Sequence, residues 1–146
     1  MYELKNFLDK YGRDTTTNFY LRDIAKDLGI KCSIIMRDEL KHYKDKNCLI
    51  INLQTSNENG SHWILASKKF KIYFDSYGVV PIKEIYENYF IDDSTPWVYN
   101  TFQVQKPNIK IFGQLCCFVL YSLENGKNFH DIVIELYKTI ILNLFF

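Results

Sequence analysis

The sequence has little net charge and no long apolar run. Its 18 Lys and Arg residues nearly balance its 17 Asp and Glu residues, which leaves a formal net charge of +1. So small a positive charge does not support electrostatic binding to nucleic acid or to an anionic membrane surface. No window reaches the roughly 18 uninterrupted apolar residues of a membrane span. We therefore expect neither nucleic acid nor a membrane among the partners of this chain.

Signals for secretion and for metal binding are also missing. The first residues, MYELKN, do not form a signal peptide, so we expect an intracellular, reducing compartment in which the four cysteines remain thiols. Cys116 and Cys117 are adjacent and point to different sides of a helix, and Cys32 and Cys48 lack the spacing of metal ligands. The sequence predicts no disulfide framework, no metal and no cofactor.

Apolar and aromatic residues, in contrast, are abundant. They make up 47% and 16% of the chain respectively, which excludes the intrinsically disordered class. A chain of 146 residues is long enough for one domain with a sizeable core. No repeat, low-complexity segment or linker divides it, so we predict a single domain over residues 1–146.

Hydrophobic patterns predict helices towards both ends of the chain and strands in its middle. A short amphipathic pattern near the N-terminus precedes a helix over 18–28, with Thr17 or Asn18 as its cap and Gly29 as its stop. Another helix is expected after Pro81, and a last one from Asn128 to about 144. Strands are expected over 48–53, 62–67, 70–75 and 97–104. This order predicts an α+β domain with a mainly antiparallel sheet.

The stretch from Gln105 to Leu123 predicts the central element of the domain. A polar turn at 107–108 leads into a run that is apolar nearly all round, as a helix buried on every side would be. We expect this helix to start at about residue 112. The N–H groups and the dipole at a helix N-terminus stabilise negative charge, including a thiolate. Gly113 stands at this point, where a bare backbone lets another group approach closely.

Two polar residues at strand ends are candidates for chemistry. His62 starts one predicted strand and Asp75 ends the next, so pairing of the two strands brings them to the same sheet edge. An Asp in that place can orient an imidazole and stabilise its charged form. Gln105 precedes the buried helix and has a side-chain amide able to donate to an oxyanion. Taken singly, however, these residues are more typical of polar sheet edges and of a loop glutamine than of a catalytic site, and Trp63 alone is more typical of core packing.

Four short motifs lie in one order along the chain: GSHW at 60–63, FDSYG at 74–78, QKPN at 105–108 and GQLCC at 113–117. In order and spacing they resemble the adenovirus protease (adenain) family of cysteine proteases. The likeness is closest to the adenain-like proteases of Polinton/Maverick elements and adintovirus-like viruses. Segments at 36–40 and 51–53 are also similar, and the resemblance covers roughly residues 18–140.

This resemblance implies an adenain-like, papain-related α+β fold and a cysteine endopeptidase. In that family the enzyme cleaves capsid and core precursor proteins during virion maturation, so a peptide or capsid-precursor substrate and a virion or viral replication site are implied. Carried over by position, His62 is the general base, Asp75 orients it and Gln105 is the oxyanion donor. Trp63 and Gly113 are implied to lie on the substrate side.

The resemblance fails at the nucleophile. The family's Cys is expected seven residues after Gln105 and directly before Gly113, and that position is Phe112. A phenyl ring cannot attack a carbonyl. Cys116 shares a helix face with residue 112 but lies four residues further along the chain. At a rise of about 1.5 Å per residue, this places it roughly 6 Å deeper along the helix axis. Attack requires the reacting atoms to be within about 3–3.5 Å of each other. Burial in an apolar run also makes a thiol inert. We therefore expect a catalytically degenerate protease domain.

Other interpretations stay open at this point. Proteases of ubiquitin-like proteins share the His–Asp–Gln–Cys order, and a peptide-binding or structural virion component needs no nucleophile. The Phe at position 112 is either one sign of wider decay or an isolated lesion in an otherwise intact protease. The persistence of His62, Asp75 and Gln105 favours a recent loss.

Overall fold

The computed structural model describes residues 2–54, 62–90, 96–106 and 110–142. Helices lie towards the two ends of the chain and strands in its middle, which confirms the α+β prediction. In chain order the elements are α1 (Leu4–Tyr11), α2 (Asn18–Leu28), β1 (Ser33–Met36), the 3-10 helix η1 (Arg37–His42), β2 (Cys48–Asn52), β3 (Trp63–Ser67), β4 (Ile72–Phe74), α3 (Lys83–Tyr89), β5 (Val98–Tyr99), α4 (Phe112–Glu124), α5 (Phe129–Leu136) and the π-helical turn η2 (Tyr137–Ile141).

The sheet is mixed, and this corrects the expectation of a mainly antiparallel one. Its strands lie in the order β1-β2-β3-β4-β5. The central pairs β2–β3 and β3–β4 are antiparallel, whereas the outer pairs β1–β2 and β4–β5 are parallel. A parallel pair cannot be closed by a tight hairpin and needs a crossover. Here η1 lies between β1 and β2, and α3 lies between β4 and β5.

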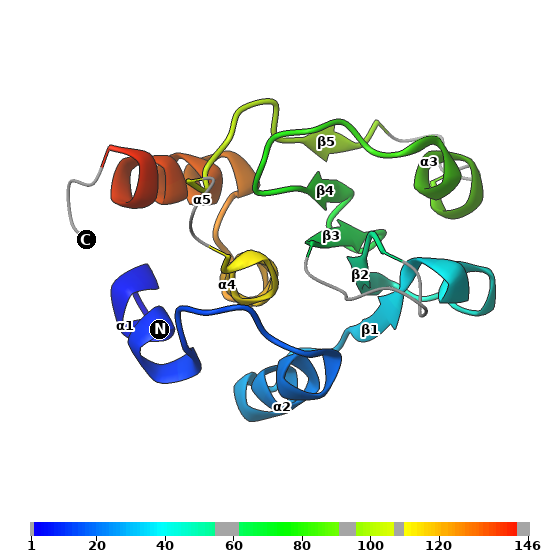
Figure 1. The fold of residues 1–146 in the computed structure, drawn as a ribbon. Coiled ribbons are helices and arrows are strands. Elements are labelled where there is room, and N and C mark those ends of the chain that lie inside the picture. Colours follow the sequence, from blue (N-terminus) through cyan, green and yellow to red (C-terminus); the bar gives the residue numbers. More distant parts are fainter. Residues whose placement is uncertain (1, 55–61, 91–95, 107–109, 143–146) are drawn as a thin grey trace.

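Both faces of the sheet are buried over its three central strands. Along β3 and β4, Leu65 and Phe74 join the larger apolar cluster, while Ile64 and Tyr73 join a smaller one on the opposite face. The alternation follows from the two-residue period of a strand. Figure 1 shows α4 on one side of the sheet and α3 towards the other end of the molecule. All residues of β2, β3 and β4 are therefore buried, as in a sheet covered on both sides.

Helix α4 is the centre of the larger cluster. Every residue from Phe112 to Leu120 is buried, which confirms the prediction of a helix buried on all sides from about residue 112. The helix contacts β3 on one side and α1, α2 and α5 on the others. Figure 1 looks nearly along its axis and shows these elements arranged around it. The polar turn expected at 107–108 lies outside the described residues.

Helix ends follow the sequence signals closely. The side chain of Thr17 accepts a hydrogen bond from the Tyr20 N–H at 3.2 Å, and Gly29 ends α2 in the left-handed conformation with φ +70°. Asn128 caps α5 by accepting from the N–H groups of the first turn. Helix α5 does not run on to about 144, because Leu136 is followed by the π-helical turn. No helix of the described segments has both the length and the apolarity needed to cross a membrane.

The strand predicted over 97–104 is reduced to β5, which spans Val98–Tyr99. The chain leaves the sheet at Asn100, whose side chain bonds to the backbone of Asp75 instead of continuing the ladder. The predicted strand over 70–75 is shorter too, because Lys71 has φ +56° in the turn between β3 and β4.

Gly113 has a packing role that its sequence position does not reveal. A Cβ built on it would lie 2.7 and 2.8 Å from the two methyl carbons of Leu21 and 2.9 Å from the methyl of Thr16. The space beside this glycine is thus filled by α2 and the residues before it. The expectation of an open approach at Gly113 is wrong, since the glycine allows α4 to pack closely against α2.

We predict that Gly113→Ala destabilises the fold by about 1–3 kcal/mol, because the added methyl overpacks the contact with Leu21. In an unhindered helix the same change stabilises by up to about 1 kcal/mol, so the sign of the effect is diagnostic. Chemical denaturation of the two proteins measures it. The double variant Gly113→Ala, Leu21→Ala should show favourable coupling, and strict additivity would contradict the contact.

Candidate active site

His62 and Asp75 meet at one end of the central strands. His62 directly precedes β3 and Asp75 directly follows β4, and these strands are antiparallel neighbours with Leu65 opposite Phe74. The His62 Nε2 atom lies 3.0 Å from Asp75 Oδ1. The His62 side chain is 25% exposed and that of Asp75 only 2%. The predicted contact between the two side chains is confirmed, with a buried carboxylate holding a partly exposed imidazole.

The Asp75 carboxylate is itself fixed by its own turn. Its Oδ1 atom also accepts a hydrogen bond from the Tyr77 N–H at 2.8 Å. The Asp75 backbone is held from a distance, because the Asn100 Oδ1 accepts from the Asp75 N–H at 3.1 Å and the Asn100 Nδ2 donates to the Asp75 carbonyl at 2.6 Å. Asn100 is 5% exposed, so both bonds are shielded from water. This amide clamp determines where the carboxylate stands.

Ser76 connects this turn to Gln105. The Ser76 hydroxyl donates to Gln105 Oε1 at 3.0 Å, and the Ser76 carbonyl accepts from the N–H groups of Val104 and Gln105 at 2.8 and 3.2 Å. Gln105 is fully buried. Because its carbonyl end is bound to Ser76, the amide nitrogen is the end directed away from that residue. This orientation makes the Gln105 side chain a fixed donor.

Phe112 stands at the first position of α4, in contact with the imidazole. The ring centroids of His62 and Phe112 are 4.7 Å apart with an interplanar angle of 32°. Tyr77 completes the group, with its ring edge-on to Phe112 at 5.0 Å and to His62 at 5.4 Å. Phe112 is 6% exposed. The position predicted for a nucleophile therefore does adjoin the histidine, and an aromatic ring fills it.

The thiols are unsuited to replace the missing nucleophile. Cys116 and Cys117 lie one turn further along α4 and are completely buried. Burial raises the pKa of both thiols well above the ordinary value, and the charge of Asp75 acts in the same direction on Cys116. Cys32, next to β1, is also shielded, and burial raises its pKa to about 12. Each of these groups is a protonated thiol at neutral pH.

Trp63 is part of the core and does not form a binding surface. It is 2% exposed and belongs to the apolar cluster around α4. Its indole N–H has no hydrogen-bond partner in the described part of the chain. Since Gly113 is packed against α2, neither of the two residues implied to lie on the substrate side is open to a substrate in this structure.

Sequence reasoning missed Asn100 and Ser76. Ser76 lies inside a motif but has no side-chain chemistry that points to Gln105, and Asn100 follows a weak strand pattern with nothing to mark it as a partner of Asp75. Both act through hydrogen bonds to residues 25 or more positions away. Among the described residues no group of three or more His, Cys, Asp or Glu side chains is arranged to hold a metal ion.

Neither a scan against protein-family models nor a search of curated proteins finds a match to this chain. The roles of the site residues therefore depend on the geometry described above and on the resemblance of the four sequence motifs.

The amide clamp is tested by Asn100→Ala. We predict a loss of about 1–3 kcal/mol in the free energy of unfolding, because the change leaves the buried N–H of Asp75 without its partner. It also removes one of the two donors to the Asp75 carbonyl, which keeps the Gly78 N–H at 2.8 Å. Asn88→Ala is the matched control, since this exposed amide also donates to a backbone carbonyl, that of Glu84 at 2.7 Å. The control should change stability by no more than about 0.5 kcal/mol. Equal effects of the two substitutions in urea denaturation would contradict the role of Asn100.

We predict that Cys116 of the native chain does not react with thiol-directed peptide warheads or with iodoacetamide near pH 7, because its thiol is buried and protonated. Mass spectrometry after labelling measures this, with a urea-denatured sample as the positive control. Labelling of Cys116 in the folded protein that disappears in His62→Ala would instead reveal a working Cys–His pair.

Proposed function

We propose that this chain has an adenain-like, papain-related cysteine-protease fold whose peptide-hydrolysing site has lost its nucleophile. The observation that carries the proposal is the 3.0 Å contact of His62 with Asp75, together with the ring of Phe112 against the same imidazole at the first turn of a buried helix. A base, its orienting carboxylate and the expected nucleophile position are adjacent. Among these three positions, residue 112 is the one whose side chain is incompatible with catalysis.

The choice of imidazole nitrogen supports this assignment. The Asp75 carboxylate contacts the Nε2 atom of His62. The other ring nitrogen, Nδ1, is therefore the one that can receive a proton from a nucleophile. In a nucleophile–His–carboxylate site one ring nitrogen serves the nucleophile while the other is held by the orienting group. Asp75 is buried and fixed by the Tyr77 N–H, so it can hold the ring in one orientation.

The start of α4 supports it further. A thiolate at residue 112 would gain from the helix dipole and from a neighbouring imidazolium, and both lower a thiol's pKa. The oxyanion of a tetrahedral intermediate needs donors, and the candidates are the backbone N–H of residue 112 and the side-chain amide of Gln105. Ser76 fixes the orientation of that amide.

In its present form the site cannot form an acyl-enzyme. Phe112 has no atom able to attack a carbonyl, and the four thiols of the chain lie elsewhere. The function that remains to such a domain is to bind a polypeptide without cutting it. By the resemblance of its motifs, the ancestral substrate class is the precursor proteins of a virion or of a Polinton-type element.

We predict that Phe112→Cys restores peptide hydrolysis. His62 would take the thiol proton, the thiolate would attack the peptide carbonyl carbon, and the imidazolium would give the proton to the leaving amine, which leaves an acyl thioester. His62 would then take a proton from a water molecule whose oxygen attacks the thioester carbonyl, and would return that proton to the departing thiolate as the acid product is released. Removing the packed ring is expected to cost about 1–3 kcal/mol, which a folded domain survives. The assay is cleavage of a peptide library by the folded variant, with the parent chain expected to be inactive.

Phe112→Cys with His62→Ala is the matched control and should be inactive. Ubiquitin-like fusions and capsid-precursor peptides are assayed side by side, and preference for the former would replace the viral substrate class with that of a deSUMOylase-type protease of ubiquitin-like proteins. If the folded single variant cleaves neither set, then the site has decayed beyond one residue and the chain is a binding or structural module.

A further inference from the structure

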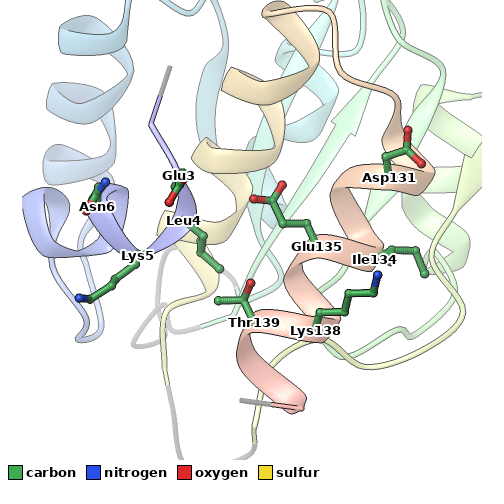
Figure 2. A pocket seen from close by; sticks show the side chains of 9 residues that line it. All are labelled: Glu3, Leu4, Lys5, Asn6, Asp131, Ile134, Glu135, Lys138 and Thr139. Carbon is green, nitrogen blue, oxygen red and sulfur yellow. The ribbon is translucent and has the colours of Figure 1, made fainter. Parts of the chain in front are cut away.

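A concave site lies between the beginning and the end of the described chain, apart from the His62 site. It is a cavity of about 560 Å³ between the N-terminal turn of α1 and one side of α5 and η2. Figure 2 shows the gap between these helices and the side chains that line it. None of the lining residues takes part in the His62 site, so this cavity is independent of the proposed function.

The side chains that point into the gap carry no positive charge (Figure 2). Figure 2 shows Glu135 and Thr139 pointing from their helix towards α1, with the side chain of Leu4 facing them. The amines of Lys5 and Lys138, in contrast, extend away from the gap. A carboxylate, a hydroxyl and an aliphatic wall therefore converge. This combination suits a cationic group on an aliphatic chain and does not suit an anion.

Thr139 supplies a polar group to this cavity. The residue as a whole is only 6% exposed, and it lines the cavity. Its hydroxyl is not among the buried side-chain atoms of the described residues that lack a partner, so it is accessible from the cavity and can accept or donate a hydrogen bond there. Thr139 also lies in the π-helical turn Tyr137–Ile141, a rare backbone form that occurs frequently at functional sites.

Glu135 has capacity for a further donor. Its Oε2 atom lies 3.3 Å from the Lys127 Nζ, while Oε1 has no hydrogen bond to any residue that the structure describes. A carboxylate has about four acceptor sites, so the ion pair with Lys127 leaves room for a second cation. Counting the whole lining, three carboxylates (Glu3, Asp131 and Glu135) face two lysines.

We propose that this cavity binds an aliphatic ammonium group. The ammonium donates to Glu135 and Thr139, and the attached methylene chain packs against Leu4 and Ile134. A lysine side chain of a polypeptide and a free alkyl diamine both carry this chemistry. Lysine-like groups pack their methylenes on apolar surface while the charge reaches a polar partner, which is the arrangement that the cavity offers.

The test is titration of the 146-residue chain with two probes, N-acetyl-lysine methylamide and 1,4-diaminobutane, followed by backbone NMR shifts. Saturable shifts are expected at Glu3 to Asn6 and at Asp131 to Thr139. Binding of the capped lysine alone identifies a polypeptide source, and binding of the diamine alone identifies a free amine. The uncharged analogue N-acetyl-norleucine methylamide should bind at least tenfold more weakly.

Substitutions at the cavity distinguish binding at this site from a general effect of protein charge on the affinity for the amine. Glu135→Gln should weaken binding at least tenfold and Thr139→Val about threefold or more. Glu124→Gln is the control, because this carboxylate pairs with Lys69 at 2.9 Å away from the cavity, and it should leave affinity unchanged. Lys127→Met removes the ion pair of Glu135 while keeping the carboxylate, and should leave binding equal or tighter.

Thermal unfolding followed by circular dichroism verifies that each variant is folded. If Glu135→Gln does not fold, Thr139→Val is the variant that decides the test. The proposal is overturned by the absence of saturable shifts with both probes. Equal affinity of the parent and of the folded Glu135→Gln and Thr139→Val proteins would overturn it as well.

Discussion

The burial of α4 on every side is the constraint from which the rest of the arrangement follows. A helix with no polar face must be covered all round, and here β3, α1, α2 and α5 provide the cover. Close approach of α2 requires a glycine at 113, because any side chain there would meet Leu21. The same covering leaves the first turn of the helix beside the polar groups of the His62 site, with Phe112 against the imidazole.

The polar residues at that turn are held by bonds that cross the fold. Asp75 is clamped by Asn100, and Ser76 is bonded to Gln105, so two segments far apart in sequence set the positions of the carboxylate and the amide. Both clamps are buried, where a hydrogen bond is strong and its loss is costly. These hydrogen bonds fix the positions of the site residues whether or not the site carries out a reaction. The geometry of the site follows from the way the segments after β4, after β5 and before α4 are bonded to one another.

The sequence predicted well those features that depend on adjacent strands or on residues within one helical turn. His62 and Asp75 belong to neighbouring antiparallel strands, and the caps at Thr17 and Asn128 act within one turn, so spacing alone locates them. The parallel pairing of the outer strands β1 and β5 was missed, because pairing across a crossover leaves no periodic signal. The tightness around Gly113 was misread as open space, since its neighbour Leu21 is distant in sequence. Asn100 was missed for the same reason, as its partner Asp75 is a long-range one.

These contacts bear on why a chain without a nucleophile keeps the other site residues. Asp75 bonds the Tyr77 N–H, and Gln105 receives the Ser76 hydroxyl, so each has a structural use that needs no thiol. His62 packs on the ring of Phe112, which gives the imidazole an aromatic contact. Selection for stability alone would then retain all three polar residues. Under the proposed loss of a nucleophile, their presence is therefore no measure of how recent that loss is.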